Sequence, residues 1–502
     1  MRKNWRDIDI RLAAVLCSLL LSLWHVALNP IPNADAFEYV RAAHVYLDEG
    51  IAAAFAWYPA ATYPVLMGAL HRLTGIDLLS AGQLINALFY ALLVYSFIAL
   101  VQEIRDTRRI ALLAAIVVLV FPTLNEYRYY LIRDIGFLAF MLSGALQLTR
   151  YSKTYRWPHG ALFILFTCLA ALLRGEALVY LPLVPLALLT QGRESWGRQV
   201  RALLTIEAAL LALAVLGLFA TFVLGIDILG TLQRMLHVYW PFLRDAMAAM
   251  GEKDSALSRA VFGEYAANFS GEYIWVFMLS GLTAVLVVKL ISGFGVPALA
   301  LLFWGAAQHR TPIGARALRP VLAYALVSFA IILSFLLLTR FLSSRYTLLF
   351  TLSCLVLLPN IIDETLTRLG ESRYPRLLGN LLWGLLAFSA VDAHISFGDS
   401  KTALHEASDW LQENTQAGDS VLTNSPYVAY FSGRVAEYDL VLRYLAEDAI
   451  ENAPYGAVLV LTTSSSIRAQ IQRNLEFQRI EFVTAFPHTD EPDVLIYKRL
   501  GN

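Results

Sequence analysis

Apolar runs of about twenty residues recur along this 502-residue sequence, and they limit the folds that it can adopt. A transmembrane helix needs about 20 mainly apolar residues, and segments such as 12–28 and 202–224 are close to that length. Hydrophobic residues make up 58% of the chain and charged residues only 16%, whereas a soluble domain is usually about a quarter charged. We therefore predict a polytopic α-helical membrane protein.

The positions of Lys and Arg predict how these helices are oriented. Basic residues are concentrated in the N-terminal head and in alternate turns between the apolar segments. The positive-inside rule then places the N-terminus in the cytoplasm and the loops 29–80 and 225–273 outside. This pattern predicts about eleven spans if the segment 274–306 crosses the membrane once. That segment contains Gly293 and Gly295, and a second crossing there would reverse the orientation of all later segments.

The chain is predicted to contain two parts. Residues 1–393 form the membrane part, in which Arg174-Gly175-Glu176 divides the apolar segment 161–190 into two short spans, because thirty helical residues would be about 45 Å long. From residue 394 to 502 the composition becomes that of a soluble protein, with short strand patterns such as AVLVLTTS and helix patterns such as SIRAQIQRNLEF. We predict a small periplasmic α/β domain there, which binds an acceptor or supports the membrane part.

The first external loop carries two acids on one predicted helix face. Asp35 and Glu38 are three residues apart, and Tyr39 lies on the same side, with Asn33 as a candidate N-cap. Tyr58 and Tyr63 follow among prolines and aromatic residues, which indicates a rigid loop at the membrane interface. The alternative is an ordinary solvated loop whose acids cap helices.

Further charged residues fall on the same predicted outer face. They are Glu126, Arg128, Arg133, Asp134, Arg174, Glu176, Arg340 and Arg345, with Tyr346 beside the last. Arginine suits a phosphate because its planar fork binds two oxygens, and a carboxylate suits a general base. The alternatives are that Arg133 and Asp134, or Arg174 and Glu176, only pair with each other, and that Arg340 only reaches lipid headgroups.

Other classes of site have little support in the sequence. The formal net charge is zero and no basic tract indicates nucleic-acid binding. The three cysteines form no CxxC pair, and the histidines form no HExxH or similar metal motif.

The order of these motifs resembles the GT-C superfamily of polytopic glycosyltransferases, in the group of the aminoarabinose transferases and protein O-mannosyltransferases. The resemblance covers essentially the whole chain. It rests on DAFEY at Asp35, the tract YPAATYPVLMGALHRLTG, then LIRD, LLRGEALVYLP, SSRYTLLF and finally ASDWLQENTQAGDSVLT. One departure concerns the acid pair, because many members have two adjacent acids where Ala36 follows Asp35 here.

The resemblance implies an inverting glycosyltransferase of the bacterial inner membrane, which moves a sugar from a polyprenyl-phosphate donor to a lipid, glycan or protein acceptor. It implies that Asp35 is the general base, with Glu38 nearby and either Glu126 or Asp134 as the second-loop acid. Arg345 with Tyr346 holds the lipid phosphate, supported by Arg174 and Arg133, and the acceptor contacts are Tyr39, Tyr58 and Tyr63.

The sequence leaves three questions open: the use of a metal, a transport function and a non-catalytic function. Some members use a divalent metal such as Mg²⁺ or Mn²⁺ between such acids; we slightly prefer a site of carboxylates alone, and the sequence does not decide between the two. A polytopic lipid transporter or flippase also places charges near a membrane cavity, although it often shows internal repeats, which we do not find. A non-catalytic assembly protein with the same fold is the third possibility.

Overall fold

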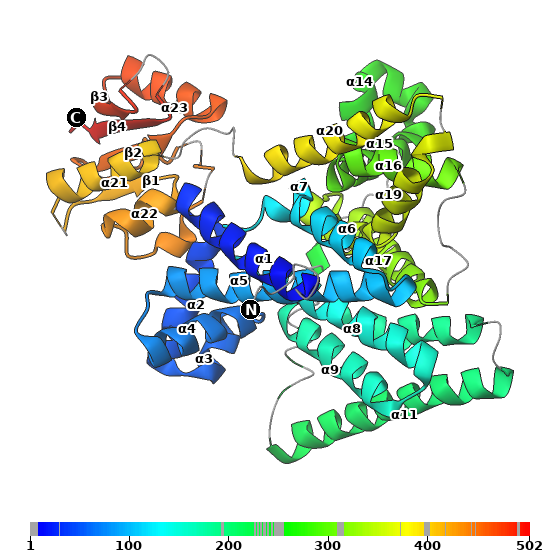
Figure 1. Cartoon of the computed structure of the whole chain (residues 1–502). Coiled ribbons are helices and arrows are strands. Elements are labelled where there is room, and N and C mark those ends of the chain that lie inside the picture. The colour runs from blue at the N-terminus through cyan, green and yellow to red at the C-terminus, as the bar shows by residue number, and fades with distance from the viewer. Residues whose placement is uncertain are drawn as a thin grey trace, which may run out of the picture.

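The computed structural model describes residues 9–501, apart from position 30, residues 192–194, most of 225–255, residues 309–315, 372, 396–401, 417, 443, 447 and 489–491. Much of the loop 225–273, which the sequence predicts to be external, therefore lies outside the described residues. A large helical part is followed by a smaller part with a β-sheet (Figure 1). This arrangement confirms the coarse prediction of a helical membrane protein with a C-terminal sheet domain, while the boundary at 393/394 stays a prediction.

The helical part begins with one long helix and a compact group of three short ones. These are α1 (Ile10–Leu28), α2 (Asp35–Glu49), α3 (Ile51–Trp57) and α4 (Thr62–Thr74). The next helices are α5 (Leu78–Ile104), α6 (Arg108–Leu119), α7 (Pro122–Asn125), α8 (Asp134–Thr154), α9 (Trp157–Leu173), α10 (Ala177–Leu183), the 3₁₀ helix Val184–Thr190 and α11 (Trp196–Leu224). The rest are α14 (Ala256–Ser270), α15 (Ile274–Phe294), α16 (Val296–Ala307), α17 (Leu318–Thr339), α18 (Leu348–Leu355), α19 (Leu358–Thr367) and α20 (Pro375–His394), with 3₁₀ turns at Gly271–Tyr273, Ser344–Thr347 and Leu369–Glu371.

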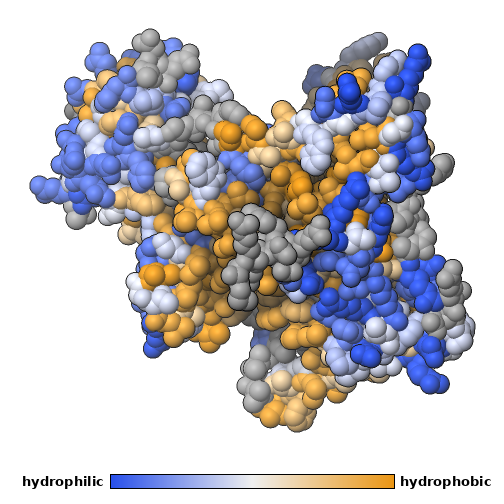
Figure 2. Space-filling view, in the orientation of Figure 1, coloured by the Kyte–Doolittle hydropathy of each residue, from blue (hydrophilic) through white to orange (hydrophobic). Residues whose placement is uncertain are grey.

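Six helices among the described residues are long and apolar enough to cross a membrane, or seven if the bent pair Ser344–Leu355 and Leu358–Thr367 forms one span. Shorter apolar helices, such as Trp157–Leu173 and Val296–Ala307, fall below that length. The sequence count of about eleven includes such short segments and stays a prediction. Figure 2 shows broad hydrophobic areas over the helical part and a mainly hydrophilic surface over the sheet part, as expected for a chain that is only partly embedded in lipid.

Two breaks predicted from the sequence are present. The apolar segment 161–190 is interrupted at Arg174-Gly175-Glu176, between α9 and α10. The segment 274–306 is interrupted at Gly295, whose φ of +69° lies in the region that favours glycine, and α15 ends there as α16 begins. Of these two helices, α15 belongs to a candidate span and α16, with 12 residues, does not reach spanning length by itself.

The core of the helical part lies around α5 and α8. Helix α5 packs along α1 and α8, and α8 packs along α9. The start of α5 is capped by the side chain of Asp77, which accepts a hydrogen bond from the Ser80 amide at 2.9 Å. Buried apolar and aromatic residues along both helices, among them Tyr90, Phe97 and Leu142, fill the space between them. These helices form the frame on which the outer loops rest.

The C-terminal part has a four-stranded sheet with helices on both faces. Its elements are α21 (Thr402–Asn414), β1 (Val421–Thr423), α22 (Pro426–Ser432), the 3₁₀ turn Tyr438–Leu440, β2 (Val458–Thr462), α23 (Ser465–Glu476), β3 (Ile480–Phe486) and β4 (Val494–Arg499). The strand order is β1-β2-β4-β3, and only β1 and β2 are parallel. Along β2 the side chains alternate: Val460 packs with α21 and α22, whereas Leu459 and Leu461 pack with α23.

The sheet part shares its core with helix α2. Phe37 of α2 is 1% exposed and contacts the rings of Tyr427, Tyr430 and Phe431 at centroid distances of 6.0, 5.1 and 6.1 Å. Arg41, one turn later, lies 3.9 Å from Asp439. The helix that begins with Asp35 is therefore held from one side by the C-terminal part.

Candidate active site

A cavity of about 890 Å³ opens beside the outer loops of the helical part. Most of its wall is apolar and comes from α10 and α17, with residues such as Val179, Leu183 and Leu326. Its polar lining comes from the α3–α4 loop, the start of α8, the α9–α10 turn and the 3₁₀ turn before α18. Those polar residues are Tyr58, Arg133, Asp134, Arg174, Glu176, Arg345 and Tyr346. A long apolar wall joined to a set of arginines fits an amphipathic ligand with an anionic head.

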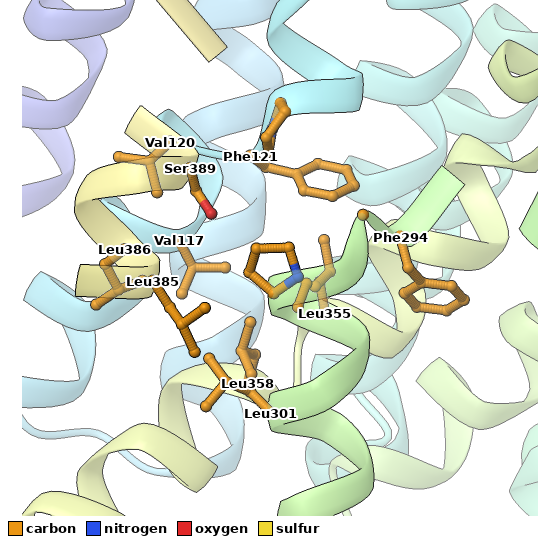
Figure 3. A pocket seen from close by; sticks show the side chains of 14 residues that line it. Val117, Val120, Phe121, Phe294, Leu301, Leu355, Leu358, Leu385, Leu386 and Ser389 are labelled. Atoms are coloured by element: carbon orange, nitrogen blue, oxygen red, sulfur yellow. The ribbon is translucent and has the colours of Figure 1, made fainter. Parts of the chain in front are cut away.

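A second cavity is much smaller and almost entirely apolar. It measures about 30 Å³ and lies among α6, α16, α18, α19 and α20 (Figure 3). Its lining is apolar except for the hydroxyl of Ser389, so it offers no charged group to a ligand. We regard it as a packing gap.

Asp35 is the first residue of α2; it is not itself part of the cavity lining, but it contacts Arg345, which is. Its Oδ2 accepts a hydrogen bond from Nη1 of Arg345 at 2.9 Å, although the two residues are 310 positions apart. Both side chains are partly open to solvent, with exposed fractions of 42% for Asp35 and 27% for Arg345. The structure thus joins the predicted general base to the predicted phosphate contact.

The predicted N-cap before α2 is wrong. Asn33 makes no side-chain cap, because residue Ala34 occupies the N-cap position without a side-chain hydrogen bond. The Asn33 carboxamide oxygen instead accepts a hydrogen bond from the Leu131 amide at 2.8 Å. This contact links the start of α2 to the loop before α8, so it positions the acids of the two outer loops relative to each other.

Arg174 is the centre of a more buried ion-pair group. Its guanidinium pairs with Asp134 at the start of α8 and with Glu176, whose Oε1 lies 2.6 Å from Nε. The sequence left open that Arg174 pairs with Glu176, and this pair is present. The sequence also left open that Arg133 pairs with Asp134. Among the described residues, Asp134 instead forms its ion pair with Arg174. The side chains of Arg174 and Asp134 are only 15% and 8% exposed.

Tyr346 lies between the two arginine groups. The guanidinium of Arg174 is 4.8 Å from the centre of its ring, and that of Arg345 is 5.3 Å away. The Tyr346 hydroxyl also accepts a long hydrogen bond of 3.4 Å from Arg345. Cation–π contacts of this kind orient an arginine without using up its hydrogen-bond donors.

The aromatic residues of the first loop form a chain of ring contacts toward Arg133. The Arg133 guanidinium lies 5.8 Å from the ring of Tyr58, which is 5.9 Å from that of Tyr39, and the rings of Tyr39 and Tyr63 are 5.4 Å apart. Only Tyr58 of these three lines the cavity. Tyr63 is fully buried, and its hydroxyl donates to the Gly82 carbonyl at 2.9 Å, which is a packing role.

Three of the other predicted charges lie outside the cavity lining. Glu126, in the α7–α8 loop, is exposed as a whole residue, but its carboxyl is partly enclosed, and this burial and then the nearby Asp392 raise its pKa. Arg128 is 2% exposed and donates to the Ser18 carbonyl at 2.9 Å and to the Ser22 hydroxyl at 2.9 Å, so it ties the loop to α1. Arg340 is exposed at the end of α17. Asp134 is therefore the second-loop acid that lies at the cavity.

Glu38 lies one helical turn after Asp35 and has no hydrogen bond or ion pair that joins it to the arginines. Burial of its carboxyl, and then the charge of Asp35, raise its pKa above the ordinary value of 4.5. The residue as a whole reaches the surface while its carboxyl is partly enclosed by its neighbours, and it is not part of the cavity lining.

The acids at this site do not fit a divalent metal as they are arranged. Asp35 is bound to Arg345, and both Asp134 and Glu176 are bound to Arg174, so their charges are already balanced by guanidinium groups. The described residues contain no group of three or more His, Cys, Asp and Glu side chains placed to share an ion. We derive no step through a metal.

Sequence reasoning missed the apolar wall of the cavity and the anchoring of α2 by Phe37. The wall residues of α10 and α17 have the same composition as lipid-facing residues, so no pattern separates them. The only available signal was the polar Tyr180 and Ser328, whose hydroxyl groups lie 2.9 Å apart within these apolar helices.

Comparison with solved structures finds a similar fold. The chain is similar to the oligosaccharyltransferase of Archaeoglobus fulgidus in its complex with Zn and sulfate, with 13% identity and a TM-score of 0.50 over 89% of this chain and 68% of that one. A second structure of that protein, tethered to an acceptor peptide with the sequence NVT, has 12% identity and a TM-score of 0.47 over 86% and 64%. No protein-family model and no curated protein matches the chain.

At this identity the similarity concerns the fold alone. The fold of this chain is therefore similar to that of an archaeal oligosaccharyltransferase, and membership of the GT-C superfamily stays a prediction from the sequence. The narrower subgroup of aminoarabinose transferases and protein O-mannosyltransferases stays a prediction.

Proposed function

We propose that this protein is a membrane glycosyltransferase that uses a polyprenyl-phosphate-linked sugar as donor. The observation that carries the proposal is the cavity of about 890 Å³, which combines an apolar wall on α10 and α17 with three arginines in its lining. The lipid tail lies along the apolar wall, and its phosphate faces Arg133, Arg174 and Arg345. The similarity of fold to an archaeal oligosaccharyltransferase adds to this.

The reaction that this geometry supports is a direct displacement. Asp35 takes the proton of the acceptor hydroxyl or amide as the acceptor atom forms a bond to the anomeric carbon of the sugar. The bond between that carbon and the phosphate oxygen breaks, and its electron pair leaves with the lipid phosphate. One displacement inverts the configuration of the sugar.

The arginines supply electrostatic stabilisation to this step. Negative charge increases on the departing phosphate, and guanidinium groups fixed beside it lower the energy of the transition state. Arg174 is itself fixed by Asp134 and Glu176, so its orientation does not depend on the ligand. Arg345, by contrast, pairs with the partly exposed Asp35 and contacts the ring of Tyr346, while the buried Asp134 acts on it without an ion pair among the described residues.

The proposal extends to location and acceptor. The resemblance implies a bacterial inner membrane, and the positive-inside pattern then orients the N-terminus to the cytoplasm and the C-terminal sheet part to the periplasm. The acceptor is a lipid, glycan or protein that reaches Asp35 from that side. Because the sheet part packs on α2 through Phe37, it lies close to the path of such an acceptor.

The test is a transfer assay with purified full-length protein in proteoliposomes. The donor is a polyprenyl phosphate that carries a radiolabelled sugar, and solubilised envelope material serves as acceptor. We expect the wild type to move label from the lipid fraction to the acceptor fraction, and Asp35→Asn to leave it on the lipid. Asp48→Asn, the same change at an exposed acid on the same helix, is the control and should behave like the wild type.

Two results would count against the proposal. If the wild type leaves every labelled sugar on its lipid, the transferase function is wrong. If it moves the intact lipid from one leaflet to the other without breaking the sugar–phosphate bond, the transporter interpretation replaces it.

A further inference from the structure

Asp35 and Arg345 contact each other, although in the proposed reaction Asp35 has to accept a proton and Arg345 has to bind the phosphate. Oδ2 of Asp35 accepts from Nη1 of Arg345 at 2.9 Å. While Oδ2 of Asp35 accepts this hydrogen bond, that oxygen is not free to accept a proton from an acceptor. The same contact occupies a donor of Arg345 that a phosphate needs. The observed arrangement is therefore suited neither to deprotonation nor to full phosphate binding.

We propose, on the basis of the function proposed above, that the donor phosphate takes the place of Asp35 on Arg345 and so releases Asp35 to act as the base. The Asp35–Arg345 pair is then an exchangeable contact that the substrate opens. Donor binding precedes productive acceptor binding, because the base becomes available only when a phosphate lies beside it.

The exposure of the pair permits such an exchange. Ion pairs between partly exposed side chains contribute only about 0–1 kcal/mol, because water and salt screen them. Asp35 is 42% exposed and Arg345 27% exposed, so little is lost when they separate. A phosphate carries more charge and more acceptor oxygens than one carboxylate, and it binds arginine in a fork.

Arg133 gives the incoming phosphate a place to bind before the exchange. It lines the same cavity, and its Nη1 is buried without a hydrogen-bond partner among the residues that the structure describes. An unsatisfied charged donor is costly, so an anion beside it gains free energy. The neighbouring Arg174 differs from Arg133 because its guanidinium already pairs with two acids, Asp134 and Glu176.

The exchange predicts that Asp35 competes with the donor for Arg345. Purified full-length protein in detergent is titrated with farnesyl phosphate, and binding is measured by calorimetry, with farnesol as the uncharged control. Asp35→Asn should bind farnesyl phosphate about fivefold more tightly than the wild type, since it removes the competing carboxylate. Glu38→Gln, which removes a charge one turn away that is not bonded to Arg345, should change the affinity by less than about twofold.

A double-mutant cycle separates the exchange from a general charge effect. In an Arg345→Ala background, Asp35→Asn should no longer tighten binding. The inference is overturned if Asp35→Asn and Glu38→Gln tighten binding equally, if Asp35→Asn has no effect, or if its effect persists without Arg345. If no variant binds farnesyl phosphate better than farnesol, the proposed donor site itself fails, which is a different outcome.

Discussion

Two arginine–carboxylate groups lie at the cavity, one around Arg174 and one around Arg345, and they differ in how far they are exposed to solvent. Arg174 is held by Asp134 and Glu176 in a place where Arg174 and Asp134 are 15% and 8% exposed. Among the described residues, Asp35 is the one acid within ion-pair distance of Arg345, although the charge of Asp134 also acts on it, and the side chains of Arg345 and Asp35 are 27% and 42% exposed. Loss of one partner of a buried pair leaves an uncompensated charge and is costly, whereas an exposed pair separates easily. The first group therefore suits a fixed part of the scaffold, and the second suits a contact that a substrate can open.

The largest expected effect is on catalysis through the exposed group. Asp35→Asn should reduce the rate of sugar transfer by about 10²–10⁴-fold, the usual contribution of a positioned general base. The thermal unfolding midpoint in detergent should change little, because the Asp35–Arg345 pair is partly exposed. The rate is measured with saturating labelled donor. An Asp35→Asn protein with near-normal transfer would remove Asp35 from the mechanism.

The next effect is on stability through the buried group. Arg174→Met leaves Asp134 and Glu176 without their partner and should destabilise the fold by about 3–5 kcal/mol. Thermal or denaturant unfolding in detergent measures it. The same substitution at Arg72, exposed on α4, is the matched control and should have little effect. If the two variants unfold alike, Arg174 is not a structural ion pair and the contrast between the groups is lost.

Arg345 should affect the use of the donor more than the fold. Arg345→Ala removes a charged hydrogen bond to the phosphate, which is worth about 1.5–3 kcal/mol, so kcat/KM for the donor should fall about tenfold to a hundredfold. Arg345→Lys keeps the charge and loses the fork, and it should recover part of the activity. Steady-state kinetics with the labelled donor measures both variants. Equal kcat/KM for wild type and Arg345→Ala would contradict a phosphate-binding role.

The smallest expected effect is the contribution of Glu38 to the pH dependence of folding stability. Its pKa in the folded protein is raised above 4.5 by burial and by Asp35. The folded state therefore holds this proton more strongly than the unfolded state, and stability falls as pH rises from about 4.5 through the raised pKa. Glu38→Gln should gain stability relative to the wild type over that window and keep a constant difference above it. Unfolding midpoints of both proteins across pH measure this, and parallel curves throughout would contradict the shift.

The sequence predicted the elements better than it predicted their contacts. The break at Arg174 followed from charges within an apolar run, and the strand at Val458–Thr462 followed from a β-branched pattern. Strand β3 was missed because it is largely exposed and lacks an apolar face that alternates clearly. Which arginine meets which acid depends on three-dimensional packing: Arg345 reaches Asp35 across 310 residues, and the buried Arg128 ties its loop to α1. No local pattern separates Arg128 from Arg133.

The most direct test of the account is where a polyprenyl phosphate binds. A photoreactive polyprenyl phosphate, with a diazirine near the head of the lipid, is crosslinked to the purified protein in nanodiscs, and the modified peptides are mapped by mass spectrometry. We predict adducts on α10 and α17, around Leu183 and Leu326, that decrease when Arg133 and Arg345 are both changed to alanine. Adducts spread equally over lipid-facing helices such as α11, and unchanged in the double variant, would contradict the donor site.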